Sequence, residues 1–199
     1  MKTLKIKVNF TEEVLGTASS NPHIHEEYIA SNAPDAQNLE QEVAAIGPEE
    51  VFEKQMTIFP KDKDGNPILW DYQWKGFFKD ACGMLRKVPG SECGKIKAFK
   101  KEIDGLIFVQ PRMIPINVNG EIGVCQRPLR ANTPQGERVA LASSETVPAG
   151  SSVIFSVVLM CDAHEKMVKE TLDYGKLRGF GQWRNSGKGR FEYEILEEK

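Results

Sequence analysis

The sequence predicts an α+β domain in which two helices cover one face of an antiparallel sheet, and three observations support this. Residues 3–10 alternate between apolar and polar side chains, which is the pattern of a half-buried strand. Apolar side chains recur at helical spacing in 71–87, and the end signals at 162–175 predict a second helix over 162–174. Strand-like segments at 105–117, 152–160 and 191–196 complete the order βαββαβ, which is that of the ferredoxin-like (RRM-like) fold.

The first strand and the first helix each have two distinct sides. The apolar side of the strand comprises Leu4, Ile6, Val8 and Phe10. In the helix, Asp71 is the expected N-cap, because a carboxylate can accept hydrogen bonds from the first free backbone N–H groups. The apolar side of this helix comprises Trp74, Phe77, Phe78, Ala81, Met84 and Leu85. The opposite side carries Lys75, Lys79 and Arg86, so we expect one buried and one cationic side.

The middle of the chain predicts two further strands. Residues 105–117 form one long strand in this prediction, irregular or at a sheet edge near Pro111 and Pro115, because proline cannot donate to a strand ladder. Residues 152–160 are almost continuously apolar, as in a strand of the sheet interior.

The second helix has recognisable ends. Asp162 is followed three residues later by Glu165, which resembles a capping box with an aspartate as N-cap. The helix is expected to end at Tyr174, with Gly175 as the first residue after it.

The length of 199 residues favours one domain, 1–199, with two insertions. Residues 17–60 predict short acidic helices separated by proline and glycine, and residues 118–144 predict a long β-hairpin that forms a thumb over a ligand. Residues 61–67 predict a turn, because they lack the glutamate that closes a calcium loop.

Composition excludes several classes of protein. No apolar run is long enough to span a membrane, and the N-terminus enters a strand directly, so we expect a cytoplasmic protein without a signal peptide. The four cysteines are far apart in sequence, and His23 and His25 lack further ligands at suitable spacing. We therefore expect neither a metal site nor a cofactor.

Charge is segregated along the chain despite a net charge of -2. Residues 1–60 contain four lysines and ten acidic residues, whereas 74–101 contain eight cations and only Asp80 and Glu92 as acids. Residues 173–190 contain five cations and one acid. If the two basic segments converge, they form a positive groove that attracts phosphates.

The most distinctive segment is the glycine-rich run at 175–190. It interleaves five glycines with five cations and one indole, that of Trp183. Glycine lets a backbone approach a ligand closely, lysine and arginine neutralise phosphates, and an indole offers a face on which a base stacks. Phe180, also in this run, is expected to pack beneath the loop instead.

Three motifs give the chain a resemblance to a known family. They are the glycine-rich loop of G-x-G type at 178–181 and 186–190, the Lys-Gly step at 74–79 that enters the first helix, and the turn at 145–150 before an apolar strand. In this order they resemble the repeat-associated mysterious protein (RAMP) superfamily, the ferredoxin-like RNA-binding subunits and guide-processing nucleases of CRISPR effector complexes. The resemblance covers the chain outside the two insertions, and the sequence is also similar to small uncharacterised phage and prophage proteins.

The resemblance implies RNA binding without catalysis. RAMP nucleases use a histidine near the first helix or an aspartate near the first strand, but 71–87 contains no histidine. His25 and Asp35 are the weak catalytic candidates. The residues expected to bind nucleic acid are Lys75, Lys79, Arg86, Arg127, Arg130, Lys176, Arg178, Gly179, Gly181, Trp183, Arg184, Gly187, Lys188, Gly189 and Arg190.

The leading hypothesis is a single-stranded nucleic-acid binder, more readily of RNA than of DNA, that grips the phosphate backbone and assembles side by side along a strand. A second hypothesis is a phage decoy or inhibitor of a host defence complex, or of its nucleotide signal, because the acidic segment 23–55 can imitate nucleic acid. A third is a metal-independent endoribonuclease with His25 as general base.

Overall fold

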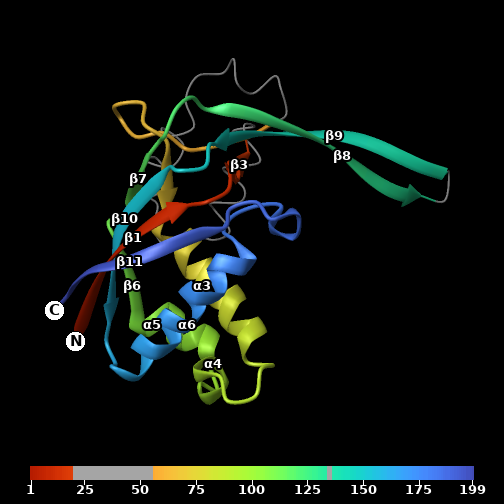
Figure 1. The fold of residues 1–199 in the computed structure, drawn as a ribbon. Coiled ribbons are helices and arrows are strands. Elements are labelled where there is room, and N and C mark those ends of the chain that lie inside the picture. Colours follow the sequence, from red (N-terminus) through yellow and green to blue (C-terminus); the bar gives the residue numbers. More distant parts are fainter. Residues whose placement is uncertain (20–55, 134–135) are drawn as a thin grey trace.

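The computed structural model describes residues 1–19, 56–133 and 136–199, without the side chains of residues 129–141. Within these residues the fold is mixed α+β, with helices packed on one face of a six-stranded sheet (Figure 1). The strands of this sheet are β1 (Lys2–Phe10), β5 (Ile68–Trp70), β6 (Ile107–Gln110), β7 (Met113–Asn117), β10 (Ser152–Leu159) and β11 (Phe191–Glu198). Their order is β11-β1-β10-β7-β5, with β6 also paired to β10, and every pair is antiparallel.

The alternation predicted for the first strand is present in β1. Leu4, Ile6, Val8 and Phe10 are buried, whereas the residues between them are partly exposed. β1 lies between β10 and β11, so both of its edges are paired, and its apolar side lies in the hydrophobic core. The two chain ends lie together because Thr3 and Lys199 exchange two backbone hydrogen bonds of 2.7 and 3.0 Å.

The first predicted helix is α3 (Asp71–Leu85), but its N-cap is Trp70 rather than Asp71. The backbone N–H of Trp70 donates to the side-chain carbonyl of Gln73 at 2.8 Å, while the Asp71 carboxylate accepts from the next N–H, that of Tyr72, at 2.9 Å. The prediction of Asp71 as N-cap was therefore wrong by one residue, because β5 runs straight into the helix and leaves no loop position before it.

The segment 105–117 is not one long strand. Its first two residues end helix α5 (Phe99–Leu106), and the rest is divided into β6 and β7 at the cis peptide bond between Gln110 and Pro111. Neither α5 nor the short helix α4 (Glu92–Lys95) was predicted, because both are too short to show a clear helical period.

The second predicted helix is α6 (Ala163–Arg178), which continues a full turn beyond the predicted end at Tyr174. Gly175 lies inside it and is buried, because the ring of Phe191 occupies the space that a Cβ would need. The residue that ends the helix is Gly179, with a φ of 80°. Asp162 stands at the N-cap position, but its side chain makes no capping hydrogen bond, so the capping box was also wrong.

Aromatic rings dominate the core between the sheet and the helices. Trp74 of α3 is fully buried, and its ring centroid lies 4.3 Å from that of Phe155 on β10 and 4.4 Å from that of Phe180. Phe191 of β11 packs edge-on against Phe77 and Phe10. This cluster joins both helices, the sheet and the segment after α6 into one hydrophobic core.

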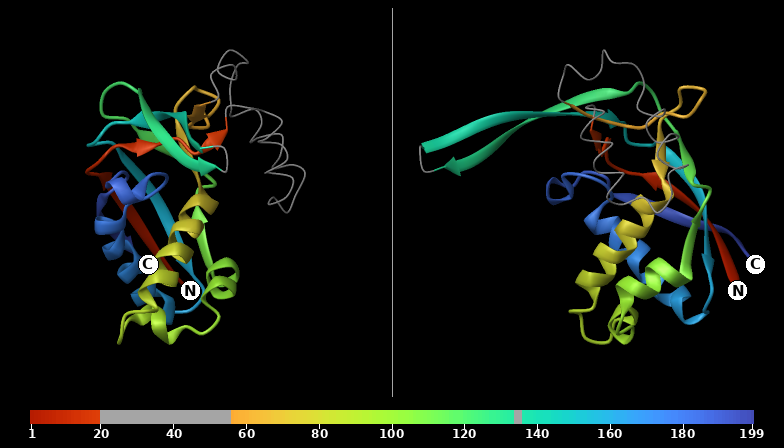
Figure 2. Two further views of the ribbon diagram at one scale, coloured as in Figure 1. Left: turned by 90° about the vertical axis from the view of Figure 1, so that its right-hand side faces the viewer. Right: turned by 180° about the vertical axis from the view of Figure 1, so that it is seen from behind.

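A second sheet lies at one end of the first and carries a long hairpin. Its members are β2 (Val14–Leu15), β3 (Ala18–Ser19), β4 (Met56–Ile58), β8 (Gly123–Thr133) and β9 (Gly136–Val147). β8 and β9 pair in one antiparallel ladder that projects well beyond the body of the protein (Figures 1 and 2). The inner end of this hairpin is fixed by β2, which pairs with β9, and by β4, which runs parallel to it.

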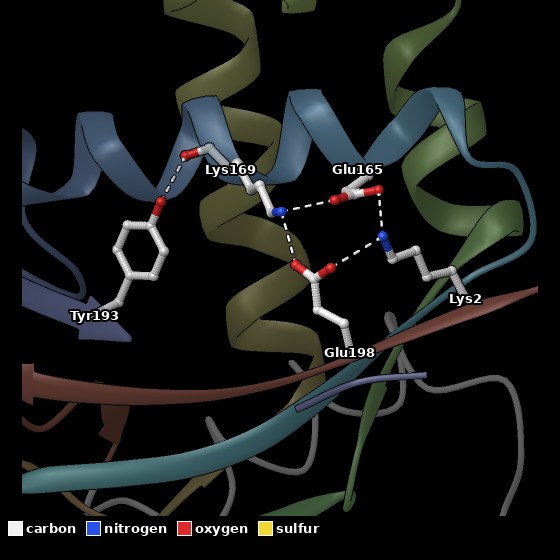
Figure 3. Close-up of polar contacts among 5 residues, drawn as sticks. All are labelled: Lys2, Glu165, Lys169, Tyr193 and Glu198. Carbon is white, nitrogen blue, oxygen red and sulfur yellow. Dashed lines mark hydrogen bonds and ion pairs between the residues drawn. The ribbon is translucent and has the colours of Figure 1, made fainter. Parts of the chain in front are cut away.

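Four charged residues connect the chain ends to α6 (Figure 3). Glu165 pairs with Lys2 at 2.8 Å and with Lys169 at 2.6 Å, and Glu198 pairs with the same two lysines at 3.2 and 2.8 Å. Hydrogen bonds from both lysines lower the pKa of Glu165 to about 2. Tyr193 donates to Asp173 at 3.2 Å, and burial is the main reason why its pKa rises to about 12.

In the part of the chain described, no helix has the length and hydropathy that a membrane span requires.

Candidate nucleic-acid interface

The segment between α6 and β11 folds into a compact loop, here called the glycine loop, residues 179–190. Five of its residues have positive φ, namely Gly179, Gly181, Trp183, Gly187 and Gly189. A short 3-10 turn, Arg184–Ser186, forms its tip. Four glycines at positive φ explain the composition of the run, since other residues are strained in this conformation.

Two of these glycines are needed because the two arms of the loop touch each other. A Cβ on Gly179 would lie 2.4 Å from the carbonyl oxygen of Lys188, and one on Gly189 would lie 1.9 Å from that of Phe180. The arms are joined by a hydrogen bond of 2.8 Å from Phe180 N–H to the Gly189 carbonyl, and Gly189 N–H donates to the backbone carbonyl of Glu13 at 2.8 Å. We predicted that these two glycines let a ligand come close to the backbone. In the structure they let the two arms of the loop come close to each other.

The two aromatic residues of the loop have opposite environments. Phe180 is only 3% exposed and stacks on Trp74, so its predicted place beneath the loop is confirmed. Trp183 is 40% exposed, and the guanidinium of Arg127 lies 4.7 Å from its ring centroid. Trp183 therefore offers an aromatic surface at the loop tip, with a cation already on one side.

Arg127 connects the hairpin to the glycine loop. Its Nη2 donates to the side-chain carbonyl of Gln182 at 3.0 Å, and Gln182 in turn donates to the carbonyl of Gly16 at 3.0 Å. Nε and Nη1 of Arg127 are buried without a hydrogen-bond partner among the described residues. The inner end of the hairpin, the glycine loop and the start of the second sheet thus form one connected surface.

Three cations in or next to the glycine loop, Lys188, Arg184 and Arg178, lie close to carboxylates. Lys188 lies 2.7 Å from Glu13, which raises the lysine pKa, and Arg184 forms a very short ion pair with Asp80 of α3. Arg178 donates to Asn185 at 2.6 Å and lies 3.9 Å from the same Asp80 oxygen. The loop is therefore less positive than its composition indicates.

Two further cations near the loop, Lys176 in the last turn of α6 and Arg190 at the end of the loop, make local contacts. Lys176 lies 3.1 Å from Asp173, the main reason why its pKa is raised, and its ammonium is 5.1 Å from the ring centroid of Tyr193. Arg190 donates from Nε to the carbonyl of Leu177 at 3.0 Å and is exposed. Neither residue lines the hollows beside the loop described below.

The cationic side of α3 does not face the glycine loop. Lys79 pairs with Asp104 of α5 at 2.6 Å, and Lys75 lies above the ring of Phe108, where burial lowers its pKa. Arg86 lies over Phe99 of α5. The two basic segments therefore do not converge as we expected. α3 faces the loop with Gly76 and Asp80, which follow Lys75 and Lys79 by one residue and so lie about 100° further around the helix.

Two neighbouring hollows border the loop. The larger, of about 510 Å³, lies between α3 and the loop, and its described lining includes Tyr72, Gly76, Asp80, Gly181, Gln182 and Arg184. The smaller, of about 330 Å³, runs over the loop tip and shares Gly181, Gln182 and Arg184 with the larger. Among the described residues, no atom outside its own helix would lie within 4 Å of a Cβ on Gly76. A ligand can therefore approach the helix backbone at this position.

Some predicted residues cannot be placed in this surface. His25, Asp35 and the acidic segment 23–55 lie outside the described residues, as does most of the insertion 17–60. The backbones of Arg130 and Arg138 pair with Val139 and Ala131 in the outer hairpin, but their side chains are not described.

Sequence reasoning missed the polar residues that organise the surface. Asp80 was visible only as one of two acids in a basic segment, and Gln182 only as a polar residue in the glycine run. Their spacing to their partners, Arg184 and Arg127, carries no local motif, since these contacts join residues 104 and 55 positions apart. The resulting surface offers arginines, open backbone and one exposed indole, which suit binding of an extended phosphate-bearing chain.

Comparison with known proteins gives structural but not sequence relatives. No protein-family model matches the sequence, and no curated protein matches it. The fold is similar to a chain of the Type III-B Cmr-β complex bound to cognate target RNA, seen by cryo-electron microscopy, with a TM-score of 0.54 and 10% identity. That match covers 99% of this chain but only 60% of the other, so this chain spans about three fifths of its length. A chain of a Type IV-B CRISPR complex matches with a TM-score of 0.50 and 11% identity, over 98% of this chain and 90% of that one. At these identities the likeness concerns the fold alone.

Proposed function

We propose that this protein is a non-catalytic RNA-binding subunit of a CRISPR-like complex, which holds the phosphate backbone of a single-stranded RNA between α3 and the glycine loop. The bound strand lies against Gly76 and Gly181, with Arg178 and Arg184 as its phosphate ligands. Trp183 stacks on a base at the tip of the loop.

The observation that carries this proposal is the hollow between α3 and the loop, at the inner end of the projecting hairpin. Elements from four parts of the chain border it, and a glycine on each side exposes the backbone. Side-chain cations are a usual means by which proteins hold nucleic-acid backbones without reading sequence, and glycines let the strand come close to the protein backbone.

The fold supports assignment to the ferredoxin-like class and to the RAMP superfamily. Counting β6 and β7 as one interrupted strand, the order β11-β1-β10-β6/β7 is strand 4-1-3-2 of a βαββαβ unit with both main helices on one face. The structural neighbours are chains of CRISPR complexes, one of them bound to RNA. Side-by-side assembly along the RNA, and a phage origin, remain parts of the proposal that rest on the sequence resemblance.

Fluorescence anisotropy with labelled single-stranded RNA and DNA tests the proposal. We expect binding to RNA that weakens between about 50 mM and about 200 mM salt, as phosphate contacts require. Arg184→Ala should weaken binding and reduce the slope of log K against log salt by about 0.7, the value for one phosphate contact on a single strand. Lys95→Ala, which alters a cation on the distant helix α4, is the control. Absence of binding to either nucleic acid at low salt would refute the proposal.

The described residues do not favour the two alternatives over this function. The inhibitor hypothesis depends on 23–55 and the ribonuclease hypothesis on His25 or Asp35, all of which lie outside the described part of the chain. Intact RNA after incubation with the protein in EDTA would exclude a metal-independent nuclease. A host protein recovered without RNA in a pull-down would favour the inhibitor instead.

A further inference from the structure

Asp80 occupies an unexpected place, since it is an acidic residue at the centre of the surface proposed to hold phosphates. It lies on α3 one turn after Gly76 and lines the larger hollow. One of its carboxylate oxygens, Oδ2, is shared by Nη1 of Arg184 and, at 3.9 Å, by Nε of Arg178. A single carboxylate therefore engages both arginines that border the two hollows.

Contacts outside this ion-paired cluster also hold the loop in shape. The loop is already fixed by the buried ring of Phe180 and by the hydrogen bonds that Gly189 makes to Phe180 and Glu13. Asp80 has a side-chain exposure of 37%, and ion pairs with this degree of exposure contribute little to folding stability. Because the Asp80 ion pair contributes little to stability and lies in the hollow, we look for its role in binding.

A phosphodiester and a carboxylate present the same chemistry to an arginine. Each carries one negative charge and oxygens that accept two parallel N–H hydrogen bonds from a guanidinium. Nε of Arg178 is buried and has no hydrogen-bond partner among the described residues, because 3.9 Å is too long for one. Both arginines are thus held near an anion, and Arg178 keeps unused donor capacity.

We propose that Asp80 competes with backbone phosphates for Arg178 and Arg184, so that this one carboxylate sets the affinity and salt dependence of the interface. The inference rests on the proposed function, because it concerns how the same surface accepts RNA. A phosphate that enters the hollow displaces Asp80, whose charge then opposes the bound strand. The glycine loop is consequently a weak anion site, because its own Asp80 neighbour occupies the arginines. Such a site suits a protein that binds RNA through several weak contacts.

The substitution Asp80→Asn tests this inference, since it keeps the side-chain shape and removes the charge. We expect RNA affinity at low salt to rise about fivefold, which corresponds to the loss of a competing ion pair of ~1 kcal/mol. The slope of log K against log salt should steepen by about 0.7, as one more cation becomes available to phosphate. Adding Arg184→Ala to Asp80→Asn should abolish most of the gain.

Asp173→Asn is the matched control. It makes the same change in net charge beside Lys176, a cation that lines neither hollow. An equal gain in affinity from this variant would show a general charge effect and overturn the inference. Unchanged or weaker binding by Asp80→Asn would also overturn it, with urea unfolding of each variant confirming that the fold is intact.

If the unaltered protein binds RNA but Asp80→Asn does not bind more tightly, only this inference fails. If the unaltered protein binds no RNA, the proposed function itself fails.

Discussion

Replacing Gly189 with alanine probes whether the glycine loop is held together by the contact of its two arms. Gly189 has a φ of 72°, a conformation that costs an alanine about 1–2 kcal/mol. The added Cβ would also lie 1.9 Å from the carbonyl oxygen of Phe180, so the arms must separate. Separation breaks the hydrogen bonds that Gly189 makes to Phe180 and Glu13, each worth about 0.5–1.5 kcal/mol. We therefore expect the free energy of unfolding to fall by about 2–5 kcal/mol.

Gly187→Ala is the matched control for this substitution. Gly187 has a φ of 85°, so alanine meets the same backbone strain, but its Cβ would only approach the flexible side chain of Arg190 at 3.6 Å. This variant should lose about 1–2 kcal/mol. Urea unfolding followed by far-UV circular dichroism measures both values. Equal losses in the two variants would refute the argument that the arms touch, because strain alone would then account for both.

Three further outcomes follow from the packing and the ion pairs. Phe180→Ala should lower the free energy of unfolding, measured in urea, by about 3–5 kcal/mol, because a ring stacked on Trp74 is lost from the core. Leu177→Ala is the control, and because that side chain is 73% exposed it should change the free energy of unfolding by no more than about 0.5 kcal/mol. Similar losses in the two variants would contradict the buried position of Phe180. Since the folded-state pKa of Glu165 is about 2, below its ordinary 4.5, its stabilisation is complete above about pH 4.5 and is lost as the pH falls toward 2. The difference in Tm between wild type and Glu165→Gln should shrink over that interval, and a constant difference would contradict the ion pairs. The difference in tyrosinate absorbance between wild type and Tyr193→Phe isolates the titration of Tyr193. Its midpoint should lie near pH 12 while circular dichroism shows a folded protein, and a midpoint near 10 would contradict the burial of Tyr193.

The fold could be predicted from the sequence where local pattern and final environment agree. The alternation in 3–10 and the helical spacing in 71–87 were reliable because each element buries most of one side against the same core, although Met84, near the end of α3, is 43% exposed. Prediction failed at the element ends. Gly175 resembled the end of a helix, yet it lies inside α6, since a ring from a distant strand needs the space of its missing Cβ.

The candidate surface was predictable in part, through the composition of its glycine run. Alternating glycines and cations indicated a loop with unusual backbone and possible phosphate ligands, and four of those glycines do adopt positive φ. The sequence could not show that Lys75 and Lys79 both contact Asp104 of α5, because a shift of one residue turns a side chain by about 100° around a helix.

By itself the sequence determined the main helices and strands, their order along the chain and the segment in which glycine and charge are concentrated, since periodicity and composition are local properties. Only the tertiary structure decided which glycines serve the packing of the loop and which charges meet. Asp80 stands 104 positions from Arg184 in the chain, yet the two form an ion pair because α3 and the glycine loop pack on the same aromatic core. Contacts of this kind depend on the relative placement of whole elements, which no short stretch of sequence encodes.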